Sequence, residues 1–118
     1  MNTLKNSVNL IGNLGKEVEI KELASGGKRA KIVIATNDYY KNNKGEAITE
    51  TQWHNLVAWG KTAELMASVL SKGNEVAIQG KLIHRSYEDK DGNMRYTSEV
   101  KVNEFMKVSR KEKEVAPF

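Results

Sequence analysis

The chain has 118 residues and a formal net charge of +4, which predicts a single domain with a mild preference for an anionic partner. It contains no cysteine, so a disulfide framework and thiolate metal sites are excluded. No apolar run approaches the ~20 residues of a membrane span, and no signal peptide is evident, so we expect a cytoplasmic protein.

The first third of the chain alternates apolar and polar side chains in the manner of β-strands. Residues 8–11 and 18–23 follow this pattern, and two glycines within residues 12–15 indicate a bend or bulge between them. Residues 25–27 predict a hairpin turn, because glycine adopts positive φ at little cost. Residues 30–36 are rich in β-branched side chains and predict a largely buried strand.

A polar turn at 42–45 precedes a segment, residues 51–61, that contains both tryptophans. Successive side chains of a strand point to opposite faces, so Trp53 and Trp59 are expected on one face, about 20 Å apart. Such rings suit stacking on unpaired bases, because every base has a π-face. The alternate positions are assigned to the core or to an interface: His54, Leu56 and Ala58.

Residues 62–71 break the strand pattern with apolar side chains at helical spacing. Thr62 is the expected N-cap, and Lys72 with Gly73 is the expected stop. Strand-like segments follow at 75–83, with a break expected at Gly80, and from residue 95 to about residue 108, beyond a charged hairpin tip.

Three strands, one helix and two strands are the element order of an OB-fold. The sequence therefore predicts an all-β fold, a five-stranded Greek-key barrel with one short helix between strands three and four. We expect this domain to span residues 1–108, and residues 109–118 to form a short tail of mixed charge.

The sequence lacks the residue patterns of a catalytic or metal site. His54 and His84 lie far apart in the chain, and no phosphate-binding loop or nucleophile elbow occurs. Residues 89–93 superficially resemble a calcium loop, but the glycine comes too early and no glutamate follows, so a hairpin turn is predicted. We therefore expect a binding module that is not an enzyme and that needs no cofactor or metal.

The remaining aromatic residues are assigned either to the core or to base stacking, according to their neighbours in the sequence. Tyr39, Tyr96 and Phe105 are assigned to the core, whereas Tyr40 and Tyr87 lie beside cations and are assigned with the tryptophans to base stacking. Basic residues close to an aromatic ring or a turn are expected to pair with phosphates: Lys41, Lys44, Lys61, Lys72, Arg85 and Arg95.

At these residues the chain resembles the bacterial single-stranded DNA-binding protein family. The resemblance runs in order from residue 4 to residue 105, and its matching segments are residues 8–15, 26–27, 34–36, 51–54, 60–64, 72–73, 76–80 and 95–100. It implies a homotetramer that binds single-stranded DNA with little sequence preference in replication, recombination and repair. The matching stacking positions are Tyr40, Trp53, Trp59 and Tyr87, and His54 matches a position near the subunit interface.

The end of the chain also resembles this family, whose members usually close an acidic tail with Pro-Phe. Pro117 and Phe118 match that tip, which in the family recruits replication and repair proteins, although the residues before them are mixed in charge. A weak electrostatic contribution to recruitment is expected.

Two other functions are compatible with the same fold. One is a protein-interaction module of the primosomal type, whose main contacts would be replication proteins. The other is an OB-fold that binds structured RNA or an oligosaccharide. Loss of DNA binding in a double tryptophan variant that keeps partner binding would favour the first, and competition assays would separate the second.

Overall fold

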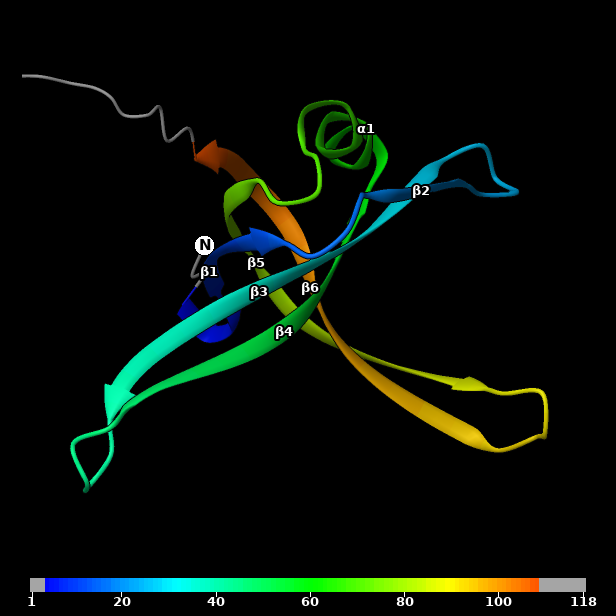
Figure 1. Ribbon diagram of the computed structural model, residues 1–118. Helices are drawn as coiled ribbons and strands as arrows, with labels where there is room; N and C mark the ends of the chain where they lie inside the picture. The colour runs from blue at the N-terminus through cyan, green and yellow to red at the C-terminus, as the bar shows by residue number, and fades with distance from the viewer. Residues whose placement is uncertain (1–3, 109–118) are drawn as a thin grey trace, which may run out of the picture.

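The computed structural model describes residues 4–108 (Figure 1). The predicted tail, residues 109–118 with Pro117 and Phe118, lies outside the described residues. None of the helices within the described part is long and apolar enough to cross a membrane. The elements follow in the order η1 (Leu4–Asn6), β1 (Val8–Leu14), β2 (Glu19–Glu22), β3 (Lys28–Lys41), β4 (Ala47–Trp59), α1 (Gly60–Val69), β5 (Glu75–Glu88) and β6 (Met94–Val108).

The strands close into a barrel. They lie in the order β1-β5-β6-β4-β3-β2, and a further pairing of β1 with β3 closes the sheet. β1 pairs with β5 over most of its length and with β3 only at Asn13 and Leu14, after which β2 continues along β3. β1 and β2 are therefore two halves of one bent strand. The predicted five-stranded barrel, with a helix before the last two strands, is confirmed.

Two glycines permit close approach of backbones within the barrel. A Cβ at Gly12 would collide with the carbonyl oxygen of Ala35, and one at Gly80 would collide with that of Lys101. The pairing of β5 with β6 shifts register between Gln79 and Gly80, and β5 then continues. The break predicted at Gly80 is wrong, because glycine there allows an irregular register within an unbroken strand.

Alternate residues of the strands fill the interior beneath α1. The predicted buried pair of β4, Leu56 and Ala58, lies in the core with 2% and 0% exposure, and Phe105 packs against it from β6 as expected. Each large aliphatic side chain buried in this way stabilises the fold by about 1.5–3 kcal/mol.

α1 begins two residues before the predicted N-cap, Thr62. Gly60 has a φ of 63°, a left-handed conformation that turns the chain from β4 directly into the helix. Trp59 is the N-cap residue and makes no side-chain cap hydrogen bond. Ala63 and Met66 are fully buried and seat the helix on the barrel.

Two hairpins extend beyond the barrel as two-stranded ribbons (Figure 1). We call residues 36–52 the β3–β4 arm and residues 84–98 the β5–β6 arm. The turns predicted at their tips are confirmed, and Gly45 and Gly92 close them with φ values of 78° and 83°. The radius of gyration is 17.2 Å, above the roughly 13 Å of a compact chain of this size, because the arms project.

Candidate nucleic-acid interface

The outer surface of β4 carries both tryptophans. The register of β3 and β4 is continuous from Arg29 opposite Trp59 to Lys41 opposite Ala47, so side chains alternate regularly between faces. Trp53 and Trp59 therefore share the face opposite the core, as predicted. Val57 lies between them on that face, and it is fully buried because Lys31 and Lys101 flank it on the neighbouring strands.

Trp59 lies among cations on the barrel surface. Its ring is partly buried, and the Lys101 Nζ atom lies 5.7 Å from the ring centroid, within the range of a cation–π interaction. Arg29 is its cross-strand neighbour on β3. The Nε atom of Arg29 is buried and has no hydrogen-bond partner among the described residues.

Trp53 is seated on the bend between β1 and β2. A Cβ at Gly15 would lie 2.5 Å from Cζ3 of Trp53, so only glycine leaves room for the ring in this position. The Trp53 side chain is nevertheless 62% exposed. One surface of the ring therefore rests on backbone, and the other is open to a ligand.

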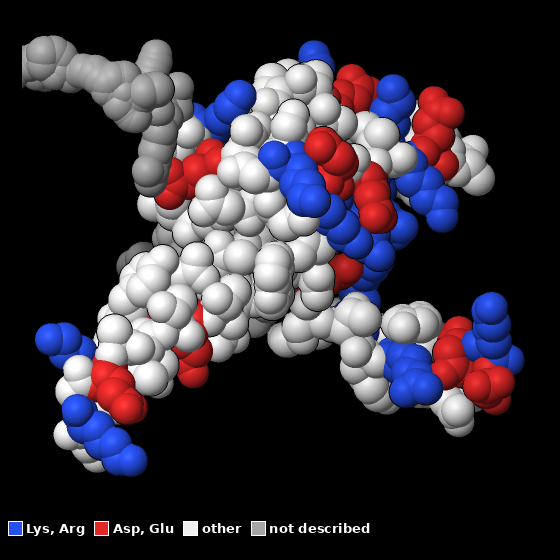
Figure 2. All heavy atoms as spheres, in the orientation of Figure 1, with Lys and Arg blue, Asp and Glu red and all other residues white. Residues whose placement is uncertain are grey.

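A basic groove separates the barrel from the β5–β6 arm. It has a volume of about 380 Å³, and its lining includes Arg29, Lys31, Arg85, Tyr87, Thr97 and Glu99. A second hollow of about 330 Å³ continues from Arg29 and Lys31 to Ile20 and Lys21 of β2. Figure 2 shows Lys and Arg side chains gathered between the β2 hairpin and this arm.

Arg85 does not stand free in the groove. Its Nε atom lies 3.1 Å from Oε1 of Glu99, and its Nη2 donates to Oε2 at 3.5 Å. The Arg85 side chain is 44% exposed, whereas that of Glu99 is 9% exposed. A buried carboxylate thus lies beneath the arginine and offsets part of the positive charge of the groove.

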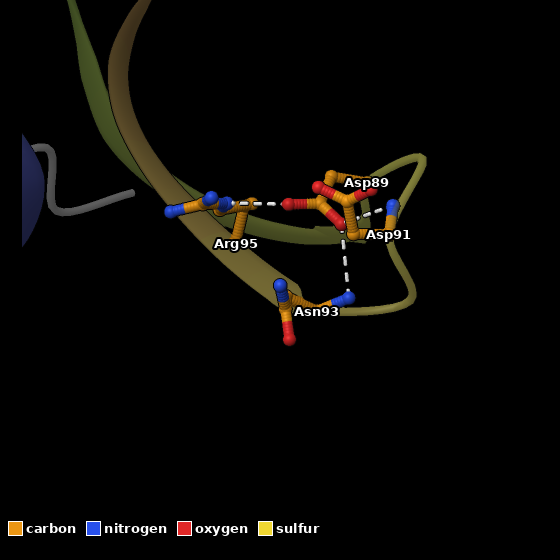
Figure 3. A network of polar contacts seen from close by, with 4 residues as sticks. All are labelled: Asp89, Asp91, Asn93 and Arg95. Atoms are coloured by element: carbon orange, nitrogen blue, oxygen red, sulfur yellow. Dashed lines mark hydrogen bonds and ion pairs between the residues drawn. The ribbon is translucent and has the colours of Figure 1, made fainter.

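Arg95 is also held by a carboxylate, at the tip of the β5–β6 arm (Figure 3). Its Nε donates to Oδ2 of Asp89 at 2.7 Å, while Oδ1 of Asp89 accepts the backbone N–H groups of Asp91 and Asn93. The Arg95 guanidinium, followed by the Asn93 N–H, lowers the pKa of Asp89 below its ordinary value. The calcium-like sequence is therefore a hairpin turn, as predicted.

The tyrosines depart from the sequence expectation. Tyr39 and Tyr96 are 73% and 77% exposed, so their assignment to the core is wrong. Tyr40 and Tyr87 are 49% and 53% exposed. Because side chains alternate along β3, Tyr39 lies on the face of the β3–β4 arm that carries Trp53, and Tyr40 lies on the opposite face.

The predicted phosphate-binding residues are widely distributed. Lys41 and Lys44 lie at the end of the β3–β4 arm, Lys61 lies in the first turn of α1, and Lys72 follows that helix. Only Arg85 lines the basic groove, with Tyr87 from the stacking set beside it. These two residues lie together in the groove, and Arg95 lies directly opposite Tyr87 on β6, whereas Lys41, Lys44, Lys61 and Lys72 lie on other parts of the structure.

His54 points to the core side of β4 at the base of the β3–β4 arm. It is partly buried, and its Nε2 atom lies 2.9 Å from the Thr36 hydroxyl oxygen. Its predicted interface role stays a prediction. Residues 4–108 contain no group of three or more His, Cys, Asp or Glu side chains that could hold a metal ion.

Three basic residues of the surface were missed by sequence reasoning: Arg29, Lys31 and Lys101. Each alternates with a buried apolar neighbour, so the period-two pattern of the strand could have assigned it to the outer face. For Arg29 and Lys31, the adjoining β-branched run from residue 32 to residue 34 concealed this alternation.

Residues 5–108 match the model of the single-strand binding protein family. The chain belongs to this family. It is 41% identical over 96 residues to single-stranded DNA-binding protein 1 of Chlorobaculum tepidum, a match that covers 80% of this chain and 59% of the relative. This family member thus spans less than two thirds of that relative's length.

Two solved structures resemble this family member. The Plasmodium falciparum SSB in complex with ssDNA has a TM-score of 0.77 and 29% identity, over 87% of this chain and 94% of that one. A deletion mutant of the single-stranded DNA binding protein from Thermus aquaticus has a TM-score of 0.78 and 21% identity, over 90% of this chain and 51% of that one. The second likeness concerns the fold alone.

Proposed function

We propose that this protein binds single-stranded DNA without sequence preference and protects it during replication, recombination and repair. Bases stack on Tyr40, Trp53, Trp59 and Tyr87, and phosphates pair with lysine and arginine side chains. Family membership and the likeness to a complex with ssDNA support the proposal.

The observation that carries the proposal is the combination of rings and cations on one continuous outer face. Trp59 and Tyr87 lie on it with Arg29, Lys31 and Lys101, from strands β3, β4, β5 and β6. Flat rings bind unstacked bases of any sequence, and cations along a groove follow the phosphate backbone. A rigid duplex hides its base faces, so the arrangement favours single strands.

Fluorescence titration with poly-dT tests the proposal. Stacking of bases on the exposed Trp53 ring is expected to quench tryptophan emission, and the affinity should fall as salt rises, with a slope of about −0.7 per neutralised phosphate. Absence of quenching at low salt, or equal binding of duplex DNA, would contradict a single-strand binder.

Two charge-reversal variants distinguish binding of DNA in the basic groove from general electrostatic attraction of DNA to the protein. Lys31→Glu acts inside the basic groove, whereas Lys107→Glu acts on an exposed residue eight positions beyond Glu99 on β6, roughly 26 Å along the strand. Both variants change the net charge equally. We expect Lys31→Glu to weaken binding of oligo-dT much more than Lys107→Glu.

We infer further that the protein self-associates as a homotetramer, with His54 near a subunit interface. An apolar groove of about 440 Å³ crosses β1, β5 and β6, and Ile11 and Met106 beside it are 60% and 64% exposed. A second copy of the chain would cover this surface. Native mass measurement tests the assembly, and Ile11→Glu with Met106→Glu should yield monomers.

Replication and repair proteins are proposed as further partners, recruited through Pro117 and Phe118, and a cytoplasmic location follows from this role. Removal of the last two residues should abolish partner binding while leaving the affinity for oligo-dT unchanged. Loss of both activities together would contradict a separate recruiting tail.

A further inference from the structure

The two tryptophan rings of β4 differ in how open they are to a ligand. Trp53 is 62% exposed, whereas Trp59, on the same face of the strand, is partly buried. A ring can stack on an unpaired base only through a surface that the base can reach. Trp53 offers such a surface in the free protein, and part of the Trp59 ring is covered by neighbouring side chains.

Lys101 supplies part of this cover. Its Nζ atom lies over the Trp59 ring, 5.7 Å from the centroid, on the side from which a base would stack there. Lys101 reaches the ring because it is the β6 partner of Val57, which precedes Trp59 on the outer face of β4. Lys101 is itself partly buried, as expected of a lysine whose stem lies along an apolar surface.

No carboxylate within residues 4–108 forms an ion pair with Lys101, and other lysines lie on both sides of it. Lys81 is directly opposite on β5, and Lys31 lies across Val57 on β3, so three cations form one row across the outer surface of the barrel. Like charges in neighbouring strands repel one another. The attraction to the Trp59 ring therefore holds Lys101 in place only until a phosphate enters the row.

We propose that Lys101 covers the stacking surface of Trp59 in the free protein and exchanges it for a base when single-stranded DNA binds. The Lys101 ammonium then moves from the ring to a phosphate. This inference rests on the proposed function. It makes the two tryptophans unequal, because a base stacks on Trp53 without displacing a cation, whereas stacking on Trp59 first breaks a cation–π contact.

Acrylamide quenching of the free protein tests the cover on Trp59. In Trp53→Phe the emission reports on Trp59 alone, and in that background Lys101→Ala should raise quenching by about twofold or more. Lys81→Ala is the matched control, because it removes the same charge from the directly opposite position and should leave the quenching of Trp59 unchanged. Lys101→Arg keeps a cation over the ring and should resemble the wild type.

The salt dependence of oligo-dT binding, followed by fluorescence anisotropy, tests the exchange. At low salt Lys101→Ala should bind more weakly than the wild type, with a slope of log affinity against log salt that is shallower by about 0.7, because one phosphate contact is lost. At high salt that contact is screened and no cation–π contact has to be broken. There Lys101→Ala should bind about two- to fivefold more tightly than the wild type, so the two curves cross. Lys81→Ala should not exceed the wild type at any salt concentration.

The outcomes distinguish this inference from the proposed function. If the wild type binds oligo-dT, unchanged quenching of Trp59 in Lys101→Ala overturns the inference alone, as does a Lys101→Ala variant that binds more weakly at every salt concentration. A wild-type protein that fails to bind oligo-dT overturns the proposed function and the exchange with it. Both lysines lie outside the hydrophobic core, and thermal unfolding checks that each variant is folded.

Discussion

Replacement of Glu99 by glutamine should strengthen DNA binding while it weakens the fold. Glu99 is the single carboxylate that lines the basic groove, and it lies 3.1 Å from the Nε atom of Arg85. Glutamine has nearly the same shape but no charge. The substitution therefore removes the ion pair of Arg85 with Glu99, and the Arg85 guanidinium can then pair with a DNA phosphate.

The magnitude follows from the exposure of the pair. Opposite charges 4 Å apart interact by about 4 kcal/mol at an effective dielectric constant of 20. The 44% exposure of Arg85 and the desolvation of Glu99 offset most of this, so we expect a loss of about 1 kcal/mol in the free energy of unfolding. A new surface pair of about 1 kcal/mol would raise the affinity for oligo-dT about fivefold at low salt.

Anisotropy titrations over a range of salt concentrations provide the assay. In Glu99→Gln the slope of log affinity against log salt should steepen by about 0.7, because one more phosphate is neutralised. In the wild type, Arg85→Gln should lower the affinity for oligo-dT only slightly. In the Glu99→Gln background, the same substitution should abolish the gain in affinity. A larger loss of affinity from Arg85→Gln in the wild type than in that background would show that Glu99 orients Arg85 for DNA. That result would refute the reasoning.

Three further variants test the seat of Trp53, the core and the arm tip. Gly15→Ala should displace the Trp53 ring by about 1 Å, lower the affinity for oligo-dT and shift tryptophan emission to the red; an unchanged spectrum would show that the ring does not rest there. Ile32→Ala, at a position with 1% exposure, should lower the free energy of unfolding by about 2–5 kcal/mol in urea denaturation, and a loss below 1 kcal/mol would contradict its place in the core. Arg95 lowers the pKa of Asp89 in the folded protein below its ordinary value of 3.8. The ion pair therefore stabilises the fold fully at pH values above 3.8, and this stabilisation is lost as the pH falls through the lower pKa of the folded state. Thermal unfolding of Asp89→Asn should therefore differ from the wild type at neutral pH and converge with it in acid.

The barrel could be predicted from the sequence because each of its strands has a buried face and a solvent-exposed face. In β4, the alternation that buries Leu56 and Ala58 also places Trp53 and Trp59 outside, and both expectations are confirmed. Glycines were harder to interpret, since a glycine that ends a strand and one that lets two backbones approach have the same sequence signature. Gly80 belongs to the second kind.

The arms could not be predicted in the same way. Beyond the barrel both faces of a two-stranded ribbon meet water, so an aromatic residue there has no core to enter, as Tyr39 and Tyr96 show. The sequence of β3 indicates two adjacent tyrosines but not which face of the arm is acidic. That depends on the register with β4, which places Glu50 opposite Asp38.

The projecting arms separate the residues that keep the protein folded from those that would hold its ligand. A two-stranded ribbon has no interior of its own, and its side chains contribute little to the barrel beneath. Substitutions on the arms can therefore alter affinity, salt response or preference among nucleic acids at small cost in stability. Evolution can exchange rings and charges on these surfaces, as with tyrosines on opposite faces of one strand, while the barrel sequence stays under its own constraints.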